Sequence, residues 1–394
     1  MKNKIELKLH EIAECIFNKA EQQDKLSSLG LYSGEFGVLL FLYHYSRYRN
    51  DPRYINIAES YTERLLNVLG DKIYIHTFCD GVSGVLFLFD YLKRMEFINI
   101  DISETKGLLE DYIIRGMRND MKSKNYDFLH GVLGIGYYFL KTKSNNDIVM
   151  EVIDYLHATA EINSTTKTAK WESLIDPDAA FRGYNISLAH GMAGIILFLC
   201  KSIEQKNQHT RVRELLEQSI NYILKQKIDC KEYGSYFPSF SIESSKELCG
   251  SRLAWCYGDL GVAYALWYAG HTINNKLWKK TGLDILLQST RRLSQSESRI
   301  IDSGICHGTI GAVIIYRHMY LKTNNICFFD ATNYWLKQTL DYAKFKDGFA
   351  GYKSHIIDRW ANDYSLLTGI SGVGLTFISY LNNDQQNWDE IFLL

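Results

Sequence analysis

The sequence predicts an all-α protein with the architecture of an α/α toroid, a closed barrel of seven inner helices enclosed by seven outer helices. Two patterns predict it: a Gly-x-x-Gly motif that occurs seven times, and amphipathic segments that alternate with the apolar runs following each motif. The 394 residues contain only three prolines, which leaves room for long helices. We expect one domain over residues 1–394, built from seven helical-hairpin repeats.

Each glycine motif is followed by a run that is apolar on nearly every face, such as VLLFLYHY or IILFLC. Runs of this kind are typical of helices that are buried on all sides. A glycine pair lets the preceding loop turn tightly and lets the helix start close to its neighbours. The motifs lie at 34–37, 81–84, 131–134, 191–194, 258–261, 308–311 and 369–372.

Amphipathic segments between the motifs supply the outer helices. In the clearest of them, 211–228, Val212, Leu215, Leu216 and Ile220 follow the helical i, i+3, i+4 spacing. Comparable segments occur near 5–23, 51–70, 101–120, 146–162, 276–295 and 329–345. An open solenoid needs polar caps at its ends, but here the first and last copies are as apolar as the others, which favours a closed ring.

Composition and charge narrow the class of protein. A net charge of −1 without a sustained basic run argues against nucleic acid or an anionic membrane as the main partner. The N-terminal stretch MKNKIELKLHEIAEC lacks the apolar core of a secretory signal. The longest uncharged window, 183–200, contains polar side chains and reads as a buried core segment, not as a membrane span. Eight cysteines without a secretory signal fit a reducing compartment, so we expect a cytoplasmic protein.

In a toroid, equivalent positions of the repeats lie at one rim of the ring. The two positions before each first glycine hold three cysteines and three histidines among fourteen residues, a concentration that packing alone does not explain. These positions are Tyr32, Cys79, Leu129, Ala189, Cys256, Cys306 and Leu367, followed by Ser33, Asp80, His130, His190, Tyr257, His307 and Thr368.

Zinc–ligand bonds are only about 2.0–2.3 Å long, so the ligands of one ion must come from neighbouring copies of the repeat. Copies five and six together offer Cys256, Cys306 and His307. Adjacent residues can face one ion because they precede the helix, and three protein ligands leave a fourth position for water or a substrate thiolate. Cys79 is across the ring and is expected to be a small buried residue.

Copies three and four place His130 and His190 on the same rim, within reach of a substrate at that metal. For His130 the favoured interpretation is a buried histidine with its hydrogen bonds satisfied inside the protein.

The stretches LAHGMAG (188–194), WCYGDLG (255–261) and CHGTIG (306–311), in this order, resemble the lanthionine synthetase C-like cyclases. The seven glycine motifs extend the resemblance over the whole chain. It implies an α/α toroid that holds one zinc ion through Cys256, Cys306 and His307. It also implies an enzyme that closes thioether rings in a ribosomal peptide whose serines and threonines are already dehydrated. The chain resembles the stand-alone cyclases, since it has no kinase-like or lyase-like N-terminal domain.

By the same resemblance, His190 would be an acid/base residue, and Asp127, Arg252 and Tyr257 match positions considered functional in the family. Asp259 departs from the family pattern, which often has proline there. His130 also departs, because relatives often carry another polar residue at that position. Neither departure touches the implied ligand set, and both could alter substrate handling near the rim.

The expected chemistry explains these residue types. Zinc deprotonates coordinated thiols, whereas a free cysteine with a pKa near 8.5 is mostly protonated at neutral pH. Addition of a thiolate to a dehydroalanine or dehydrobutyrine leaves an enolate, which needs a proton and stabilisation of its oxyanion. His190, assisted by Asp127, would be the general acid. Arg252 would stabilise the enolate, with a structural ion pair as the alternative, and Tyr257 would donate a hydrogen bond.

The expected partners are a dehydrated precursor peptide and, in the same pathway, a dehydratase and an exporter. Three other interpretations stay open: a thiol-binding or glutathione-adding protein of this fold, a peptide-binding scaffold with structural zinc, and a carbohydrate-active toroid. The last would need two rim carboxylates, but only Asp80 lies there, with Asp127 slightly behind. The connections 163–187 and 229–254 are long enough to cover the rim.

Overall fold

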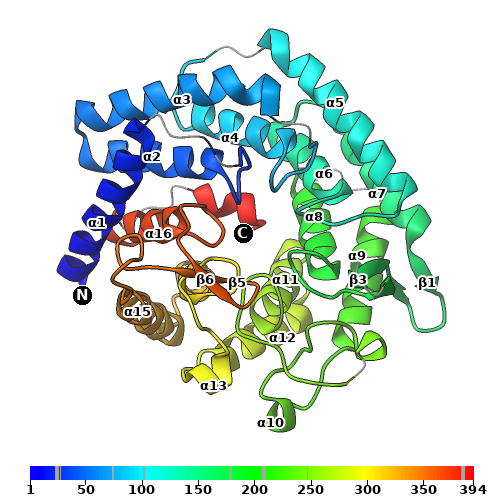
Figure 1. The fold of residues 1–394 in the computed structure, drawn as a ribbon. Helices are drawn as coiled ribbons and strands as arrows, with labels where there is room; N and C mark the ends of the chain where they lie inside the picture. Colours follow the sequence, from blue (N-terminus) through cyan, green and yellow to red (C-terminus); the bar gives the residue numbers. More distant parts are fainter. Residues whose placement is uncertain are drawn as a thin grey trace. The chain divides into compact units, whose positions relative to one another are not determined.

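The computed structural model describes residues 1–22, 26, 28–72, 75–100, 103–176, 180–205, 210–245, 247–382 and 387–394. Its helices and three small sheets are shown in Figure 1. The chain divides into two compact units, which are described one at a time. Unit 1 comprises residues 1–111, 301–392 and 394, and unit 2 comprises 112–300 and 393. The expectation of a single domain stays a prediction.

All seven inner helices begin where the glycine motifs predict. They are α2 (Glu35–Arg49), α4 (Val82–Arg94), α6 (Val132–Thr142), α8 (Met192–Glu204), α11 (Asp259–Thr272), α14 (Thr309–Thr323) and α16 (Ile370–Asn382). They are buried on most faces, as the apolar runs predict; in α8 every residue except the last is buried.

The seven outer helices agree with the amphipathic segments to within a few residues. They are α1 (Lys2–Glu21), α3 (Pro52–Lys72), α5 (Ser103–Lys122), α7 (Asn146–Thr159), α9 (Thr210–Leu224), α12 (Lys276–Ser289) and α15 (Ile326–Asp341). In α9 the predicted residues Val212, Leu215, Leu216 and Ile220 are buried. Short helices in the connections are α10 (Cys230–Tyr233), α13 (Gln295–Ser298), η1 (Ile242–Ser244) and η2 (Trp388–Phe392).

Three antiparallel hairpins were not predicted from the sequence. The connection 163–187 contributes to two of them, β1 (Glu161–Asn163) with β2 (Thr168–Lys170) and β3 (Glu172–Asp176) with β4 (Phe181–Tyr184). The third, β5 (Ser354–Ile356) with β6 (Arg359–Ala361), lies between α15 and α16. Strands of three to five residues are too short to show a clear alternation of apolar and polar side chains.

Two predictions about the chain as a whole can be compared with the described part. None of the helices described there has both the length and the apolar character needed to cross a membrane. All eight cysteines lie among the described residues, and none of them forms a disulfide bond.

The loop before each inner helix folds back over the first turn of that helix. In six copies, the N–H of the residue after the first glycine donates to the carbonyl of the residue six positions before that glycine. These bonds join Glu35 to Ser28, Val82 to Ile75, Val132 to Asn125, Met192 to Asn185, Thr309 to Asp302 and Ile370 to Asp363. The second glycine is needed because the loop lies so close: a Cβ on Gly84 would lie 2.0 Å from the carbonyl oxygen of Phe78.

Backbone hydrogen bonds also join successive repeats at the predicted rim positions. In unit 1 the N–H of Cys306 donates to Leu367, that of Leu367 to Tyr32, and that of Tyr32 to Cys79. Copies six, seven, one and two therefore adjoin in this order. In unit 2 the N–H of Ala189 donates to Cys256 in the same way. Within each unit these equivalent positions thus lie side by side.

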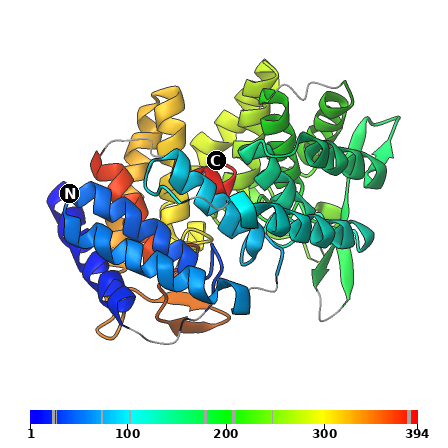
Figure 2. The ribbon, with the colours of Figure 1, turned by 90° about the horizontal axis from the view of Figure 1, so that it is seen from above.

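The last repeat packs against the first. Helix α16 contacts both α1 and α2, and Figure 2 shows the red final helix beside the blue first helices of unit 1. An open solenoid would separate its first and last repeats. This contact therefore supports the predicted closed arrangement.

The close approach at Gly84 predicts that Gly84→Ala lowers the free energy of unfolding by about 1–3 kcal/mol, because the loop backbone must move. Gly107→Ala is the matched control: Gly107 is an exposed residue of α5, and a Cβ there would meet no atom within 4 Å beyond its own helix backbone. Alanine at this position should stabilise the helix by up to about 1 kcal/mol. Thermal melts of the two variants should move in opposite directions, and equal melting temperatures would contradict the predicted constraint.

Candidate functional site

The residues that the sequence selects are divided between the two units. Unit 2 contains Asp127, His190, Arg252, Cys256 and Tyr257, and unit 1 contains Cys306 and His307. All of them lie in loops that precede an inner helix, as the repeat predicts. Each group is described within its own unit.

Asp127 and His190 form a hydrogen-bonded pair in unit 2. The distance from Nδ1 of His190 to Oδ2 of Asp127 is 2.7 Å. The other carboxylate oxygen, Oδ1, accepts the backbone N–H groups of Leu129 and His130 at 2.7 and 2.9 Å. The loop before α6 therefore fixes the carboxylate and directs one oxygen to the histidine. Such an arrangement can orient an imidazole for proton transfer.

The pair shifts the pKa values of both partners. Burial alone would raise the pKa of Asp127, but the charge and hydrogen bond of His190 hold it below its usual value, with a further contribution from His130. Burial alone would lower the pKa of His190, but the Asp127 carboxylate outweighs this effect and raises it. The combination favours a protonated His190 beside an ionised Asp127, so the histidine retains a proton that it can donate.

A cavity of about 530 Å³ opens beside this pair in unit 2. Asp127, His130, His190 and Tyr257 are among the residues that line it. The β3–β4 hairpin also contributes to the lining, through residues that include Ser173 and Arg182. Apart from residues 177–179, which lie outside the described part, the connection 163–187 thus covers the residues before the inner helices, as its length predicts.

His130 is one of the residues that line this cavity. It is exposed, and its ring lies nearly parallel to that of His190, with 6.1 Å between the ring centroids. The sequence favours a buried histidine with its hydrogen bonds satisfied at position 130, and the exposed side chain shows that this interpretation is wrong.

Tyr257 is half-buried between the histidine and the connection 229–254. Its ring centroid is 5.9 Å from that of His190 and 5.7 Å from that of Phe240. Its hydroxyl oxygen accepts the side-chain N–H of Asn185 at 3.4 Å. The hydroxyl group therefore lies in the same cavity as the Asp127–His190 pair.

Arg252 is exposed and makes no ion pair with any residue in the described ranges, so the structural ion pair considered from the sequence is not formed there. In five other copies the equivalent residue caps its own loop by accepting the N–H group two residues further on. Those residues are Ser28, Asn125, Asn185, Asp302 and Asp363. Copy five turns differently, with Gly258 at φ 87°, and the guanidinium group of Arg252 has no acceptor with which it could cap the loop in this way.

Asp259, the departure from the family pattern, anchors the connection 229–254. It is buried at the start of α11, accepts the N–H groups of Tyr236 and Phe237, and pairs with Arg292 at 3.3 Å. Burial raises its pKa to about 6. Its contacts are with protein groups that hold the connection in place.

Cys256 is 4% exposed, and its carbonyl oxygen accepts the N–H groups of Leu188 and Ala189. In unit 1, Cys306 and His307 occupy the turn directly before α14. The sequence prediction that this pair precedes its helix is therefore confirmed.

Asp302 is a buried neighbour of His307 that the sequence reasoning missed. Its Oδ2 atom lies 3.5 Å from Nε2 of His307 and accepts the N–H of His355 at 3.1 Å. Its Oδ1 atom accepts the N–H of Gly304. Alignment of the repeats six positions before the first glycine could have found it, because that position is Asn or Asp in four copies.

The predicted donor set fits zinc in its chemistry. Two cysteine sulfurs and one imidazole are ligands that zinc prefers. With Nε2 of His307 3.5 Å from the buried carboxylate of Asp302, the ring could present Nδ1 to an ion. A carboxylate behind a histidine is the usual support of a metal-binding imidazole.

A model of the family described as lanthionine synthetase C-like protein matches residues 26–393. Among curated proteins, Glutathione S-transferase LANCL1 of Danio rerio is 22% identical over 382 residues, covering 93% of this chain and 86% of that protein. The Nisin biosynthesis protein NisC of Lactococcus lactis subsp. lactis is 22% identical over 320 residues, covering 75% of each.

Among solved structures, nisin cyclase resembles this chain with a TM-score of 0.77 at 20% sequence identity, covering 98% of this chain and 96% of that one. Its fold is an α/α toroid, so the fold class predicted from the glycine repeat is confirmed. Because the family match extends over nearly the whole sequence, the protein belongs to the lanthionine synthetase C-like family.

Proposed function

We propose that the protein is a zinc-dependent lanthipeptide cyclase. It would add cysteine thiols of a precursor peptide to dehydroalanine or dehydrobutyrine residues and so form lanthionine and methyllanthionine rings. The observation that carries the proposal is the Asp127–His190 pair, which retains a donatable proton beside a 530 Å³ cavity. Family membership and the likeness to nisin cyclase support a cyclase-type enzyme.

In this proposal Cys256, Cys306 and His307 hold one zinc ion, with water or a substrate thiolate at the fourth position. When bound, the ion supplies the acidity that makes a cysteine thiol a thiolate near neutral pH. Asp302 would hold the ring of His307 in the orientation that presents Nδ1.

The reaction needs one proton delivered and one negative charge stabilised. The substrate sulfur forms a bond to the β-carbon of the dehydro residue, and the electron pair of the double bond moves to an enolate. His190 gives its proton to the α-carbon while Asp127 stays ionised and orients the imidazole. The Tyr257 hydroxyl and the exposed Arg252 guanidinium would stabilise the enolate oxygen.

A second candidate is the addition of glutathione or another small thiol by the same residues. The relative from Danio rerio, named a glutathione S-transferase, matches more of this chain than NisC does at equal identity. The two candidates differ in whether the reacting thiol belongs to the peptide itself. A cytoplasmic location and a pathway with a dehydratase and an exporter are parts of the cyclase proposal.

The first test measures zinc and thiols together. We expect about one zinc ion per purified chain, and loss of free thiols when the protein meets a dehydrated peptide that carries cysteines. Cys306→Ala should lose the zinc and react at least about 30-fold more slowly at pH 7, because a thiol of pKa 8.5 is only about 3% ionised. Cys327→Ala, an exposed cysteine of α15, is the control and should match the wild type.

The thiol assay also separates the two candidates. In one outcome, the protein binds zinc and adds glutathione to dehydro residues without consuming the cysteines of the peptide. That result would contradict the cyclase proposal and favour the second candidate.

The pH dependence tests the general acid. Because His190 must be protonated, the rate should fall as pH rises through its raised pKa. Asp127→Asn removes the charge that opposes the effect of burial, so the pKa of His190 should fall and the alkaline limb should move to lower pH. We expect about 10- to 100-fold less activity at pH 7.5. The control is Asp154→Asn, which removes an exposed carboxylate paired with Arg211 and should leave the pH profile unchanged. If the alkaline limb of the Asp127→Asn profile does not move, Asp127 does not set the pKa of the general acid.

The role of Asp302 is tested through metal affinity. We expect Asp302→Asn to weaken zinc binding by about 10- to 100-fold, measured by competition with a chelating dye. Asp347→Asn removes an exposed carboxylate in the same unit and should leave the affinity unchanged. Equal zinc affinity in Asp302→Asn and the wild type would show that Asp302 does not support the ligand.

A further inference from the structure

The β5–β6 hairpin of unit 1 carries an exposed tryptophan to which the proposed chemistry gives no role (Figure 1). Trp360, on strand β6, is 40% exposed. Its indole N–H makes no hydrogen bond with any residue in the described ranges. Single exposed apolar side chains are common on protein surfaces. This one differs because it belongs to a group of rings that is joined to the loop of His307.

Phe345 and His355 hold the indole on two sides. The ring centroid of Trp360 lies 4.9 Å from that of Phe345 and 5.1 Å from that of His355. His355 and Trp360 are direct cross-strand partners, so their side chains project from the same face of the hairpin. We call these three residues the aromatic face. Because its rings already support one another, a ligand that binds them has little side-chain motion to restrict.

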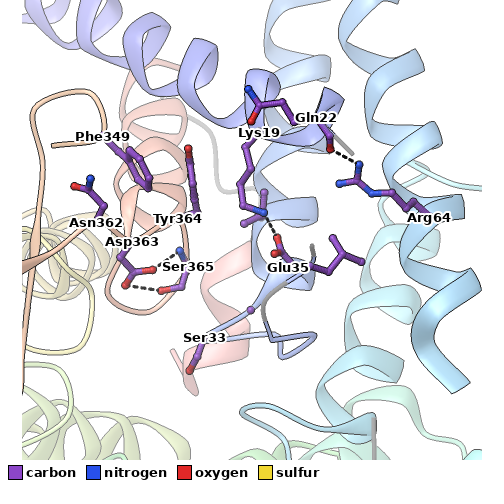
Figure 3. Close-up of a pocket in the computed structure, with 13 residues that line it drawn as sticks. Lys19, Gln22, Ser33, Glu35, Arg64, Phe349, Asn362, Asp363, Tyr364 and Ser365 are labelled. Carbon is purple, nitrogen blue, oxygen red and sulfur yellow. Dashed lines mark hydrogen bonds and ion pairs between the residues drawn. The ribbon is translucent and has the colours of Figure 1, made fainter. Parts of the chain in front are cut away.

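The stem of the hairpin is held by contacts between the two ends of its connection. The rings of Phe349 and Tyr364 stack with their centroids 3.9 Å apart. The carboxylate of Asp363 accepts the N–H and the hydroxyl of Ser365 at 2.7 and 3.0 Å, as Figure 3 shows beside the stacked rings. The hairpin therefore projects from a braced support.

Strand β5 is joined to the loop of copy six through one carboxylate oxygen. The Oδ2 atom of Asp302 accepts the backbone N–H of His355 at 3.1 Å and lies 3.5 Å from Nε2 of His307. The hydroxyl of Ser354 donates to the carbonyl of Thr368 at 2.7 Å, at the rim position of copy seven. These bonds fix the position of the aromatic face relative to His307.

The separation between His307 and Trp360 follows from these contacts. The two contacts of Asp302 lead from the His307 ring to β5, and paired strands lie about 4.8 Å apart. The Trp360 ring is therefore roughly 10–15 Å from the His307 ring. An extended peptide advances about 3.3–3.6 Å per residue, so about three or four residues cover this distance. A peptide whose cysteine reaches the proposed zinc ion can thus place a nearby side chain on Trp360.

The chemistry of the aromatic face favours an aromatic or large aliphatic side chain. Aromatic pairs gain more than the burial of their area when they meet edge to face or with offset stacking. The indole N–H adds one donor that a backbone carbonyl of the peptide can accept. The exposed charges of the turn have both signs, Asp358 beside Arg359, which does not fit an anionic membrane surface.

We propose that Trp360, supported by Phe345 and His355, is a specificity-determining residue of the cyclase. It binds an aromatic or large aliphatic side chain of the peptide about three or four residues from the cysteine that reacts. The neighbours of each cysteine would then influence how well that cysteine is presented to the metal. This inference rests on the proposed function in taking a cysteine-containing peptide as the substrate.

The test measures binding of peptides without dehydro residues to the protein with its zinc, so that no ring can form. The probes are fluorescein-labelled amides, Gly-Cys-Gly-Ser-Phe-Gly and the reverse order Gly-Phe-Ser-Gly-Cys-Gly, followed by fluorescence anisotropy. At least one of them should bind about 5- to 30-fold more tightly than its counterpart with Gly for Phe, because the phenyl ring is partly buried. Trp360→Ala should remove this difference, and Trp360→Phe should keep most of it.

Phe329→Ala is the matched control. Phe329 is an aromatic residue of α15 in the same unit, and at 38% exposed it is as accessible as Trp360. This variant should keep the full preference for Phe over Gly. Thermal melts establish that each variant is folded. Should Trp360→Ala not fold, Trp360→Thr removes the indole with a residue that suits a strand, and it should lose the preference as well.

Three results would overturn the inference. The first is equal binding of the Phe and Gly peptides in both orders, and the second is an unchanged preference in Trp360→Ala. The third is the same preference when about ten glycines separate Phe from Cys, which would indicate docking unrelated to the reacting cysteine. Failure of the proposed cyclase activity would appear in the separate zinc and thiol assays, so the two failures are distinguishable.

Discussion

One backbone hydrogen bond, repeated in six copies, determines how each inner helix begins. It joins the residue after the first glycine to the carbonyl seven residues earlier, and it holds the loop against the first helical turn. Side chains would prevent this approach, as the contact at Gly84 shows. His190, Cys306 and His307 lie in loops closed in this way, so their positions follow from main-chain geometry. In copy five Gly258 takes a positive φ instead, and the Arg252 side chain is exposed.

The helical framework could be predicted because its signals are local. Each inner helix follows a glycine pair and an apolar run, and each outer helix has its own 3.6-residue pattern. The hairpins give no comparable signal. The turn of the β5–β6 hairpin uses Ile357 and Asp358 at positive φ, where glycine or asparagine would ordinarily mark it. The division into two units likewise depends on contacts between distant segments, which periodicity does not report.

The candidate site was predictable in part for the same reason. Cys306 and His307 share one loop, so the repeat alone places them together. Asp127 and His190 are 63 residues apart, and only the family resemblance suggested them as partners before their hydrogen bond was seen. The position of Asp302 depends on a contact with His355, which belongs to the connection of another repeat. The sequence reveals such a residue only when all seven copies of the repeat are aligned position by position.

The composition of unit 1 has a consequence for the order of events during synthesis. Residues 1–111 leave the ribosome first, yet they pack with residues 301–392, which are made last. Unit 2 is nearly continuous in sequence and can fold while translation proceeds. The faces of α1 and α2 that contact α16 stay uncovered until α16 has been synthesised. Until then their apolar residues are accessible to chaperones or to other nascent chains. Because the last repeat must contact the first, unit 1 completes its folding last and is exposed to aggregation for longer than unit 2.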